Sequence, residues 1–296
     1  MSTIEKALEK QEESQNGKGS GNKGGDEPAP TEAAAPKREA PSHSSKLKDK
    51  APQIQVDVEQ LEARGMLSSD AAHGKLAEEY RLIKRPLLMN AFGEGRNRID
   101  NANLILVTSS LPGEGKTFTA VNLALSIAAE RDKTVLLVDA DVVKPAASRL
   151  FGVVDRPGLI DLLEGDATFH EVLLRTDIPK LTLLPSGRRH PHATELLASE
   201  GMVQLAEEVS RRYPDRVIIF DSPPLLATTQ ASVLATHVGQ VVLVVEAEST
   251  PQHIVKEATE MLSDCEVVGC VLNKTMQGFG LGYYAYYGYR YYNYGE

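Results

Sequence analysis

The chain has 296 residues, 42% of them hydrophobic, which is enough for one large domain or two small ones. Its formal net charge of -9 argues against nucleic acid as the main partner, because such binding depends on neutralising phosphates. No apolar run approaches the roughly 20 residues that span a bilayer, and the N-terminus lacks the apolar core of a secretory signal. We therefore expect a cytoplasmic protein that does not bind nucleic acid.

The first part of the chain is predicted to be a tether. Residues 1–11 can form a short helix with Ile4, Ala7 and Leu8 on one face. Residues 12–55 consist mainly of small, polar and charged side chains, so they cannot bury enough apolar surface to offset the entropy of ordering. We expect a disordered linker there. A folded domain is predicted over residues 56–276, followed by a distinct segment over 277–296.

The folded part begins with two predicted helices and then alternates apolar strands with helical stretches. The two helices are a stretch flanked by Leu61 and Leu67 and a longer one over Leu76–Asn90, despite Pro86. Predicted strands are Leu104–Val107, Thr134–Val138, Leu181–Leu184, Val217–Phe220, Val241–Val245 and Val267–Leu272. Predicted helices between them are Thr117–Arg131, Ala193–Arg212, Thr229–His237 and Pro251–Ser263. Short apolar strands alternating with helices are typical of an α/β fold with a doubly wound, mostly parallel sheet.

The two cysteines, Cys265 and Cys270, lie in and just before the last predicted strand. The four-ligand spacing of a zinc site is missing. We therefore expect two buried free thiols.

A loop with the spacing of a Walker A motif follows the first predicted strand, which begins at Leu104. Gly113 and Gly115 allow backbone N–H groups to wrap phosphates, which then sit at the positive end of the next helix. Lys116 can reach the β- and γ-phosphates, and the Thr117 hydroxyl can bind Mg²⁺. The predicted nucleotide-binding residues are Ser110, Gly113, Glu114, Gly115, Lys116, Thr117 and Phe118. The sequence thus predicts a P-loop NTPase fold that uses ATP and Mg²⁺.

Three aspartates follow two other strands. Asp139 and Asp141 come after Leu136–Val138, and Asp221 comes after Val217–Phe220. Ligands of open α/β sheets bind outside the carboxyl ends of the strands, so these side chains are expected to converge on the loop. Asp221 fits the residue that holds Mg²⁺ in P-loop proteins. Asp139 and Asp141 add two carboxylates, either of which can hold metal or accept a hydroxyl proton.

At these motifs the sequence resembles the bacterial tyrosine kinases (BY-kinases) of exopolysaccharide synthesis, most closely the autokinases associated with exosortase systems. The resemblance covers about residues 56–296 and rests on the loop, on the runs 139–145 and 220–224, and on the tyrosine-rich end. In the family, Arg usually stands two residues after the second Asp of the second acidic motif. Here Val143 takes that place and Lys144 follows. The partition ATPases of the ParA/MinD type share the fold but resemble the loop less, since their second lysine would fall at Leu111.

The resemblance implies an ATP-dependent protein-tyrosine autokinase that regulates exopolysaccharide synthesis or export. Lys116 would bind phosphates, and Asp139 would accept the tyrosyl proton. Metal ligands would be Thr117, Asp141 and Asp221. The alternatives are a nucleotide switch of the ParA/MinD type that organises an assembly without kinase activity, and a non-enzymatic assembly subunit of polysaccharide export.

The last segment is rich in tyrosine. Eight of the ten tyrosines are predicted phosphoacceptors, namely Tyr283, Tyr284, Tyr286, Tyr287, Tyr289, Tyr291, Tyr292 and Tyr294. Neighbouring glycines favour a mobile tail that presents its phenols to an ATP site. An adhesive aromatic tail or an added edge strand are the alternatives.

The resemblance also implies partners. The run from Glu78 through Arg81 to Lys84 matches the family's self-association helix, with Lys in place of its last Arg, and would join copies into a ring. A membrane chain-length-determining co-polymerase would activate the kinase and hold it at the inner face of the plasma membrane. A separate tyrosine phosphatase would reset it.

Overall fold

The computed structural model describes residues 52–67, 74–93, 99–213 and 215–275. The predicted N-terminal helix, most of the predicted linker and the tyrosine-rich segment lie outside these residues. The described residues fall in one compact unit. None of the helices that the structure describes is long and apolar enough to cross a membrane.

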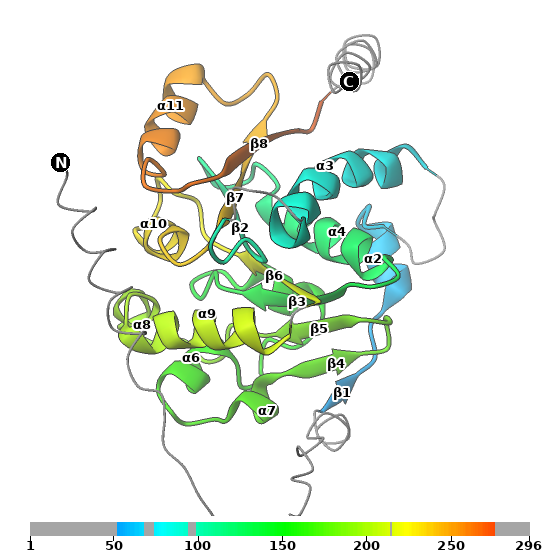
Figure 1. Cartoon of the computed structure of the whole chain (residues 1–296), viewed down its shortest axis with the longest axis vertical. Coiled ribbons are helices and arrows are strands. Elements are labelled where there is room, and N and C mark those ends of the chain that lie inside the picture. The colour runs from blue at the N-terminus through cyan, green and yellow to red at the C-terminus, as the bar shows by residue number, and fades with distance from the viewer. Residues whose placement is uncertain (1–51, 68–73, 94–98, 214, 276–296) are drawn as a thin grey trace, which may run out of the picture. The chain divides into compact units, whose positions relative to one another are not determined.

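An eight-stranded sheet forms the centre of the described part of the chain (Figure 1). The strands are β1 (Gln53–Ile54), β2 (Leu104–Ser109), β3 (Thr134–Asp139), β4 (Leu174–Thr176), β5 (Leu181–Leu184), β6 (Arg216–Asp221), β7 (Gln240–Glu246) and β8 (Val268–Asn273). Their order across the sheet is β1-β4-β5-β3-β6-β2-β7-β8. Every neighbouring pair is parallel except β4 with β5. The predicted α/β class with a mostly parallel sheet is confirmed.

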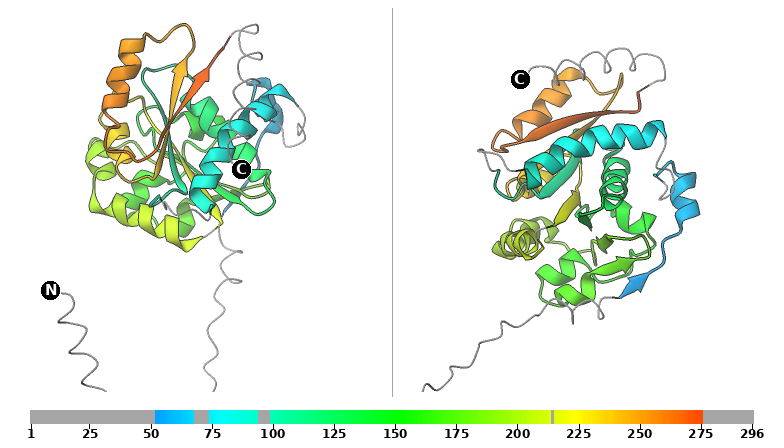
Figure 2. Two further views of the ribbon diagram at one scale, coloured as in Figure 1. Left: turned by 45° about the horizontal axis from the view of Figure 1, so that its top comes forward. Right: turned by 45° about the vertical axis from the view of Figure 1, so that its right-hand side comes forward.

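Helices cover both faces of this sheet. They are α2 (Val58–Ala63), α3 (Lys75–Phe92), α4 (Lys116–Ala128), α5 (Ala146–Leu150), α6 (Leu159–Leu163), α7 (Phe169–Val172), α8 (Ala193–Leu197), α9 (Glu200–Arg212), α10 (Gln230–Ala235) and α11 (Gln252–Glu260). Figure 2 shows α3 and α4 on one side and α9 to α11 on the other.

The alternation of side chains along each strand divides the core in two. In β2, Leu104 and Leu106 contact the layer formed by α6 and α8 to α11, whereas Ile105 and Val107 contact α4 and its neighbours. All four are fully buried. Central strands need apolar side chains on both faces because each face is covered by helices. The continuous apolar runs in the sequence therefore mark the middle of the sheet.

The edges of the sheet differ from the prediction. The folded part starts earlier than residue 56, because Gln53 and Ile54 pair in parallel with β4 and the Val56 amide donates to Asp177 Oδ1 at 3.0 Å. At the other edge, Cys270 is exposed and Cys265 is only half-buried, so the predicted pair of buried thiols is wrong. Cys270 belongs to β8, which has a strand on one side only among the described residues, and Cys265 lies before that strand.

The long predicted helix over Ala193–Arg212 is two helices. α8 ends before Ala198, and Ser199 begins α9 by accepting a hydrogen bond from the Met202 amide. A serine that caps in this way satisfies an N–H that the first turn leaves without a partner. The short elements β4, α5, α6 and α7 were not predicted, since each spans five residues or fewer.

Helix α3 contains the predicted self-association residues, and these residues differ in their burial and contacts. Glu78 and Arg81 form an ion pair on the exposed surface. Lys84 instead is 8% exposed, donates to the Ser126 carbonyl at 2.7 Å and pairs with Glu130 Oε1 at 2.6 Å. The prediction assigned all three residues to contacts between copies of the chain. In the structure, Lys84 joins α3 to α4 within one subunit, because its side chain crosses to the carboxyl end of α4.

This arrangement of Lys84 predicts a stability effect. Lys84→Met should lower the free energy of unfolding by about 1–2 kcal/mol, because the Ser126 carbonyl and the Glu130 carboxylate lose the amine that they contact. Thermal unfolding at low protein concentration measures this. Lys75→Met is the matched control, since Lys75 lies on the same helix with its side chain 55% exposed. Equal unfolding midpoints for the two variants would show that Lys84 has no role within the subunit.

Candidate active site

The predicted Walker A loop lies between β2 and α4. Gly113 and Gly115 have φ angles of 93° and 101°, a left-handed conformation that glycine adopts without steric cost. Gly115 is the residue that precedes the first turn of α4, and α4 has 13 residues. The loop amides therefore stand at the positive end of a full-length helix, where phosphate is favoured.

The register of the sheet brings the acidic residues to this loop. Asp139 at the end of β3 is the direct partner of Asp221 at the end of β6, and Asp221 is in turn the partner of Val107 in β2. Lys116 Nζ lies 3.1 Å from Asp141 Oδ2. One lysine and three aspartates from three segments of the chain thus share one end of the sheet.

Asp221 is the most deeply buried of the three aspartates. Its side chain is fully buried, and neither carboxylate oxygen has a hydrogen-bond partner within the described residues. Burial raises its pKa to about 8, a shift that the nearby charge of Lys116 and the Thr117 hydroxyl oppose. A buried carboxylate with so little compensation is suited to a cation, and Mg²⁺ prefers oxygen ligands. Asp221 therefore fits a metal-holding role.

Asp139 and Asp141 differ in how they are held. Burial raises the pKa of Asp139 to about 6, although its Oδ2 accepts a hydrogen bond from the Ser148 amide at 2.7 Å. Its Oδ1 has no partner within the described residues. Asp141 has both oxygens engaged, one by Lys116 and one by the Lys144 amide at 2.9 Å. Asp139 thus has a free oxygen and a pKa nearer neutrality, as a proton acceptor requires.

The other predicted residues of the site lie around the loop. Ser110 is buried, and its hydroxyl has no partner within the described residues. Phe118 is partly buried against the core on the α4 side of the sheet. Val143, at the place of the family's usual Arg, is 52% exposed. The structure places the Glu114 carboxylate within the protein, where it accepts from the Leu111 amide at 2.6 Å.

Two residues that touch the loop were not predicted. Thr250 donates to the Glu114 carboxylate, and Asn273 donates to the Glu114 carbonyl at 2.8 Å. Both are more than 130 positions from the loop in sequence, and neither belongs to a motif recognised from the residues alone. Only the pairing of β2 with β7 and of β7 with β8 brings them there.

No group of three or more His, Cys, Asp or Glu side chains in the described ranges has the arrangement of a metal site by itself. Mg²⁺ at nucleotide sites is usually bound by one or two protein ligands together with phosphates and water. Of the predicted metal-ligand carboxylates, Asp221 has both oxygens available, whereas those of Asp141 are already engaged by Lys116 and by the Lys144 amide.

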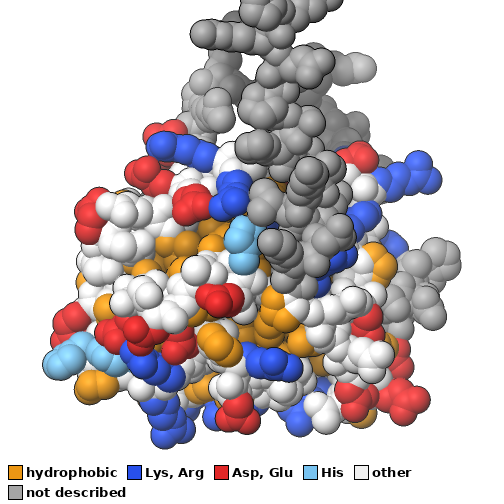
Figure 3. Space-filling model, turned by 90° about the horizontal axis from the view of Figure 1, so that it is seen from below, with side chains coloured by type: hydrophobic (Ala, Val, Ile, Leu, Met, Phe, Trp, Pro, Cys, Tyr) orange, Lys and Arg blue, Asp and Glu red, His pale blue; other side chains and the backbone are white. Residues whose placement is uncertain are grey.

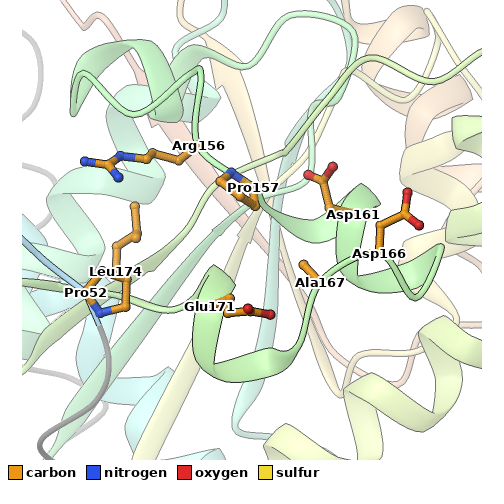
Figure 4. Close-up of a pocket in the computed structure, with 8 residues that line it drawn as sticks. All are labelled: Pro52, Arg156, Pro157, Asp161, Asp166, Ala167, Glu171 and Leu174. Carbon is orange, nitrogen blue, oxygen red and sulfur yellow. The ribbon is translucent and has the colours of Figure 1, made fainter.

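A pocket of about 360 Å³ lies away from the loop. It is lined by Pro52, Arg156, Pro157, Asp161, Asp166, Ala167, Glu171 and Leu174 (Figure 4). Arg188 pairs with Asp161 at 3.7 Å and with Asp166 at 2.6 Å, so much of the acidic charge is already balanced. In the view from below, acidic and basic side chains are interspersed around apolar ones (Figure 3). None of the residues that line this pocket belongs to the phosphate-binding loop or to the three aspartates beside it.

Several known proteins are similar to this chain. A family model described as an AAA domain matches residues 102–274. The tyrosine-protein kinase YwqD of Bacillus subtilis is 35% identical over 185 residues, which are 62% of this chain and 76% of YwqD. The chain belongs to the bacterial tyrosine kinase family. The putative tyrosine-protein kinase CapB of Staphylococcus aureus is 30% identical over 221 residues, which are 74% of this chain and 93% of CapB.

Other bacterial tyrosine kinases are longer. The putative tyrosine-protein kinase EpsB of Ralstonia nicotianae is 36% identical over 65% of this chain, but the match spans only 26% of EpsB. Among solved structures, the kinase domain of Escherichia coli ETK has a TM-score of 0.65 and 27% identity, covering 73% of this chain and 82% of that domain. The BceF tyrosine kinase domain has a TM-score of 0.60 and 27% identity, over 75% and 91%. The exosortase-associated subgroup stays a prediction.

The side chain of Asn273 lies close to Gly115, so the two loop glycines are predicted to differ in how well they tolerate a β-carbon. A β-carbon on Gly115 would lie 2.0 Å from Asn273 Nδ2, whereas one on Gly113 would meet nothing within 4 Å. Both replacements strain a positive φ, which costs about 1–3 kcal/mol. We expect Gly115→Ala to weaken ATP binding at least about tenfold more than Gly113→Ala, since about 1.4 kcal/mol is tenfold. Titration calorimetry measures this, and similar losses in both variants would contradict the contact.

The buried Asp221 predicts a pH-dependent stability. Its pKa is about 8 in the folded chain against an ordinary value of 3.8. The folded state therefore holds this proton more tightly, and wild-type stability falls as pH rises through this interval and levels off above about pH 8. Without nucleotide, Asp221→Asn should melt several degrees above wild type at pH 8, and the difference should shrink toward pH 5. Calorimetric scans across this range test it; a difference that stays constant with pH would refute it.

Proposed function

We propose that this protein is an ATP-dependent protein-tyrosine autokinase that modifies its own C-terminal tyrosines. The observation that carries the proposal is the meeting of Lys116 with three buried aspartates at a P-loop. It occurs in a chain whose relatives are named tyrosine-protein kinases. The acceptors would be the eight tyrosines of the last segment, modified between subunits. By the same family likeness, the modification would regulate exopolysaccharide synthesis or export.

Each residue of the proposed site has a separate role. Lys116 and the loop amides would bind and neutralise the phosphates, and Thr117 with Asp221 would hold Mg²⁺, which spreads the charge that develops on the phosphoryl group. Asp141 holds Lys116 in place through the 3.1 Å ion pair. Asp139 would accept the tyrosyl proton at its free oxygen. Phosphoryl transfer depends mostly on positioning and charge stabilisation, so this set is chemically sufficient.

Assembly and location extend the proposal. Self-association would use the exposed Glu78–Arg81 pair of α3, whereas Lys84 acts within the subunit. A membrane co-polymerase would activate the enzyme and hold it at the inner face of the plasma membrane, and a separate phosphatase would remove the phosphates. One structural neighbour carries the description "chimerical protein CapA2B2", with a TM-score of 0.58 and 27% identity over 72% of this chain and 98% of that chain.

A nucleotide switch of the ParA/MinD type is the second candidate, and its fold is the same. It differs in one measurable way: such a switch would bind and hydrolyse ATP without forming phosphotyrosine. Two relatives matched over most of their length, YwqD and CapB, are named a tyrosine-protein kinase and a putative tyrosine-protein kinase, which favours the first candidate.

Transfer to tyrosine is tested by mass spectrometry of the protein as purified and after incubation with Mg-ATP. Lys116→Met should abolish tail phosphorylation, because the loop loses its charge on the phosphates. Asp139→Asn should slow it by roughly 10²–10⁴-fold, the usual contribution of a general base. The controls are Lys256→Met and Asp155→Asn, which alter exposed residues outside the site. ATP turnover without phosphotyrosine in the wild type would favour the switch instead.

A further inference from the structure

Glu114 is a charged residue of the loop that faces the protein interior. Glu114 is only 2% exposed. The carboxylate accepts from three donors: the Leu111 amide at 2.6 Å, the Glu246 amide at 3.4 Å and the Thr250 hydroxyl. The first donor belongs to the loop itself, and the other two belong to the end of β7 and the turn after it. This buried carboxylate therefore joins the loop to the neighbouring strand.

The main chain of Glu114 is held from a different strand. Asn273, the last residue of β8, donates from Nδ2 to the Glu114 carbonyl at 2.8 Å. The same amide group occupies the space where a β-carbon of Gly115 would be. In a trans peptide the C=O and N–H groups point in opposite directions. Holding the Glu114 carbonyl toward Asn273 therefore directs the Gly115 N–H, one of the loop donors, away from it.

The ends of β7 and β8 are also joined to each other. Lys274 Nζ lies 2.9 Å from Glu246 Oε2, and the Ala247 amide donates to the Asn273 carbonyl at 2.9 Å. Thr250 and Asn273 thus come from one connected framework at the edge of the sheet. They contact the loop at the same residue, one through its side chain and one through its backbone.

We propose that Thr250 and Asn273 are positioning residues of the phosphate-binding loop, acting through the carboxylate and the carbonyl of Glu114. The proposal rests on the proposed use of Mg-ATP at this loop, but not on transfer to tyrosine. Removing either contact frees a loop that must present several N–H groups to the phosphates at once. Loss of pre-organisation then weakens nucleotide binding, because the loop has to be ordered when the nucleotide binds.

Thr250 is tested by two replacements of the full chain. Thr250→Val keeps the shape and removes the hydroxyl, and the Kd for Mg-ATP should rise about tenfold, as expected for one hydrogen bond to a charged group. Thr250→Ser keeps the hydroxyl and should stay within about twofold of wild type. The matched control is Thr259→Val on α11, where the exposed Thr259 donates only to the Val255 carbonyl. Titration calorimetry gives Kd, and thermal unfolding without nucleotide gives the stability of each variant.

Asn273 is tested by Asn273→Ala under the same conditions. Its Kd should rise by a similar factor, with an unfolding midpoint close to that of wild type. In the background of Gly115→Ala, however, Asn273→Ala should improve binding, because it removes the atom that the new β-carbon meets. This reversal of sign is specific to a contact over Gly115, and Asn273→Ala should give no improvement in Gly113→Ala.

The outcomes separate this proposal from the proposed function. Unchanged Kd values in Thr250→Val and Asn273→Ala would overturn the positioning role. The role would also be overturned if the loss of binding free energy were matched by an equal loss of unfolding free energy without nucleotide. It would equally be overturned if Thr250→Ser bound Mg-ATP as weakly as Thr250→Val. If wild type binds Mg-ATP but never forms phosphotyrosine, the kinase assignment fails, while the binding measurements still decide the role of Thr250 and Asn273.

Discussion

The burial of three aspartates beside one lysine is the constraint on which the site depends. Carboxylates removed from water favour the protonated form, and the raised pKa values of Asp139 and Asp221 follow from this burial. Lys116 balances only part of the negative charge, and its direct partner is Asp141. Once Asp221 is ionised, the nucleotide-free site therefore holds charge in an unfavourable state. A cation held by Asp221 would relieve it, so affinity for Mg²⁺ and instability without it have the same physical origin.

The rest of the domain can be understood as the support for this arrangement. Two strands must end side by side for Asp139 and Asp221 to become direct partners, and a third must lead into the loop. Their middle residues are buried on both faces by α4 on one side and by α9 and its neighbours on the other. Buried apolar strands fix the register firmly, because a shift by one residue would exchange the two faces. Stability in the core thus sets the geometry at the strand ends.

Sequence reasoning succeeded where the signal is local. The loop glycines, the apolar runs and the aspartates that follow them each lie within about ten residues, so the parallel sheet and the place of the loop were predictable. It failed where distant segments decide the outcome. The burial of Lys84 depends on the carboxyl end of α4, and the exposure of Cys270 depends on β8 lying at an edge. Thr250 and Asn273 acquire their contacts only through strand order. The acceptor tyrosines lie outside the described residues and stay a prediction.

The two edges of the sheet have unequal resistance to mechanical load. β1 is joined to β4 by the pairing of two residues, whereas β8 is joined to β7 over six. A force applied at residue 52 would be borne first by this short pairing, which lies at the opposite edge from β7 and β8. The weak edge would detach before strain reached Glu114. A force applied at residue 275 would act beside Asn273 and hence directly on the loop. The fold therefore isolates the nucleotide site from tension at one end of the domain and exposes it to tension at the other.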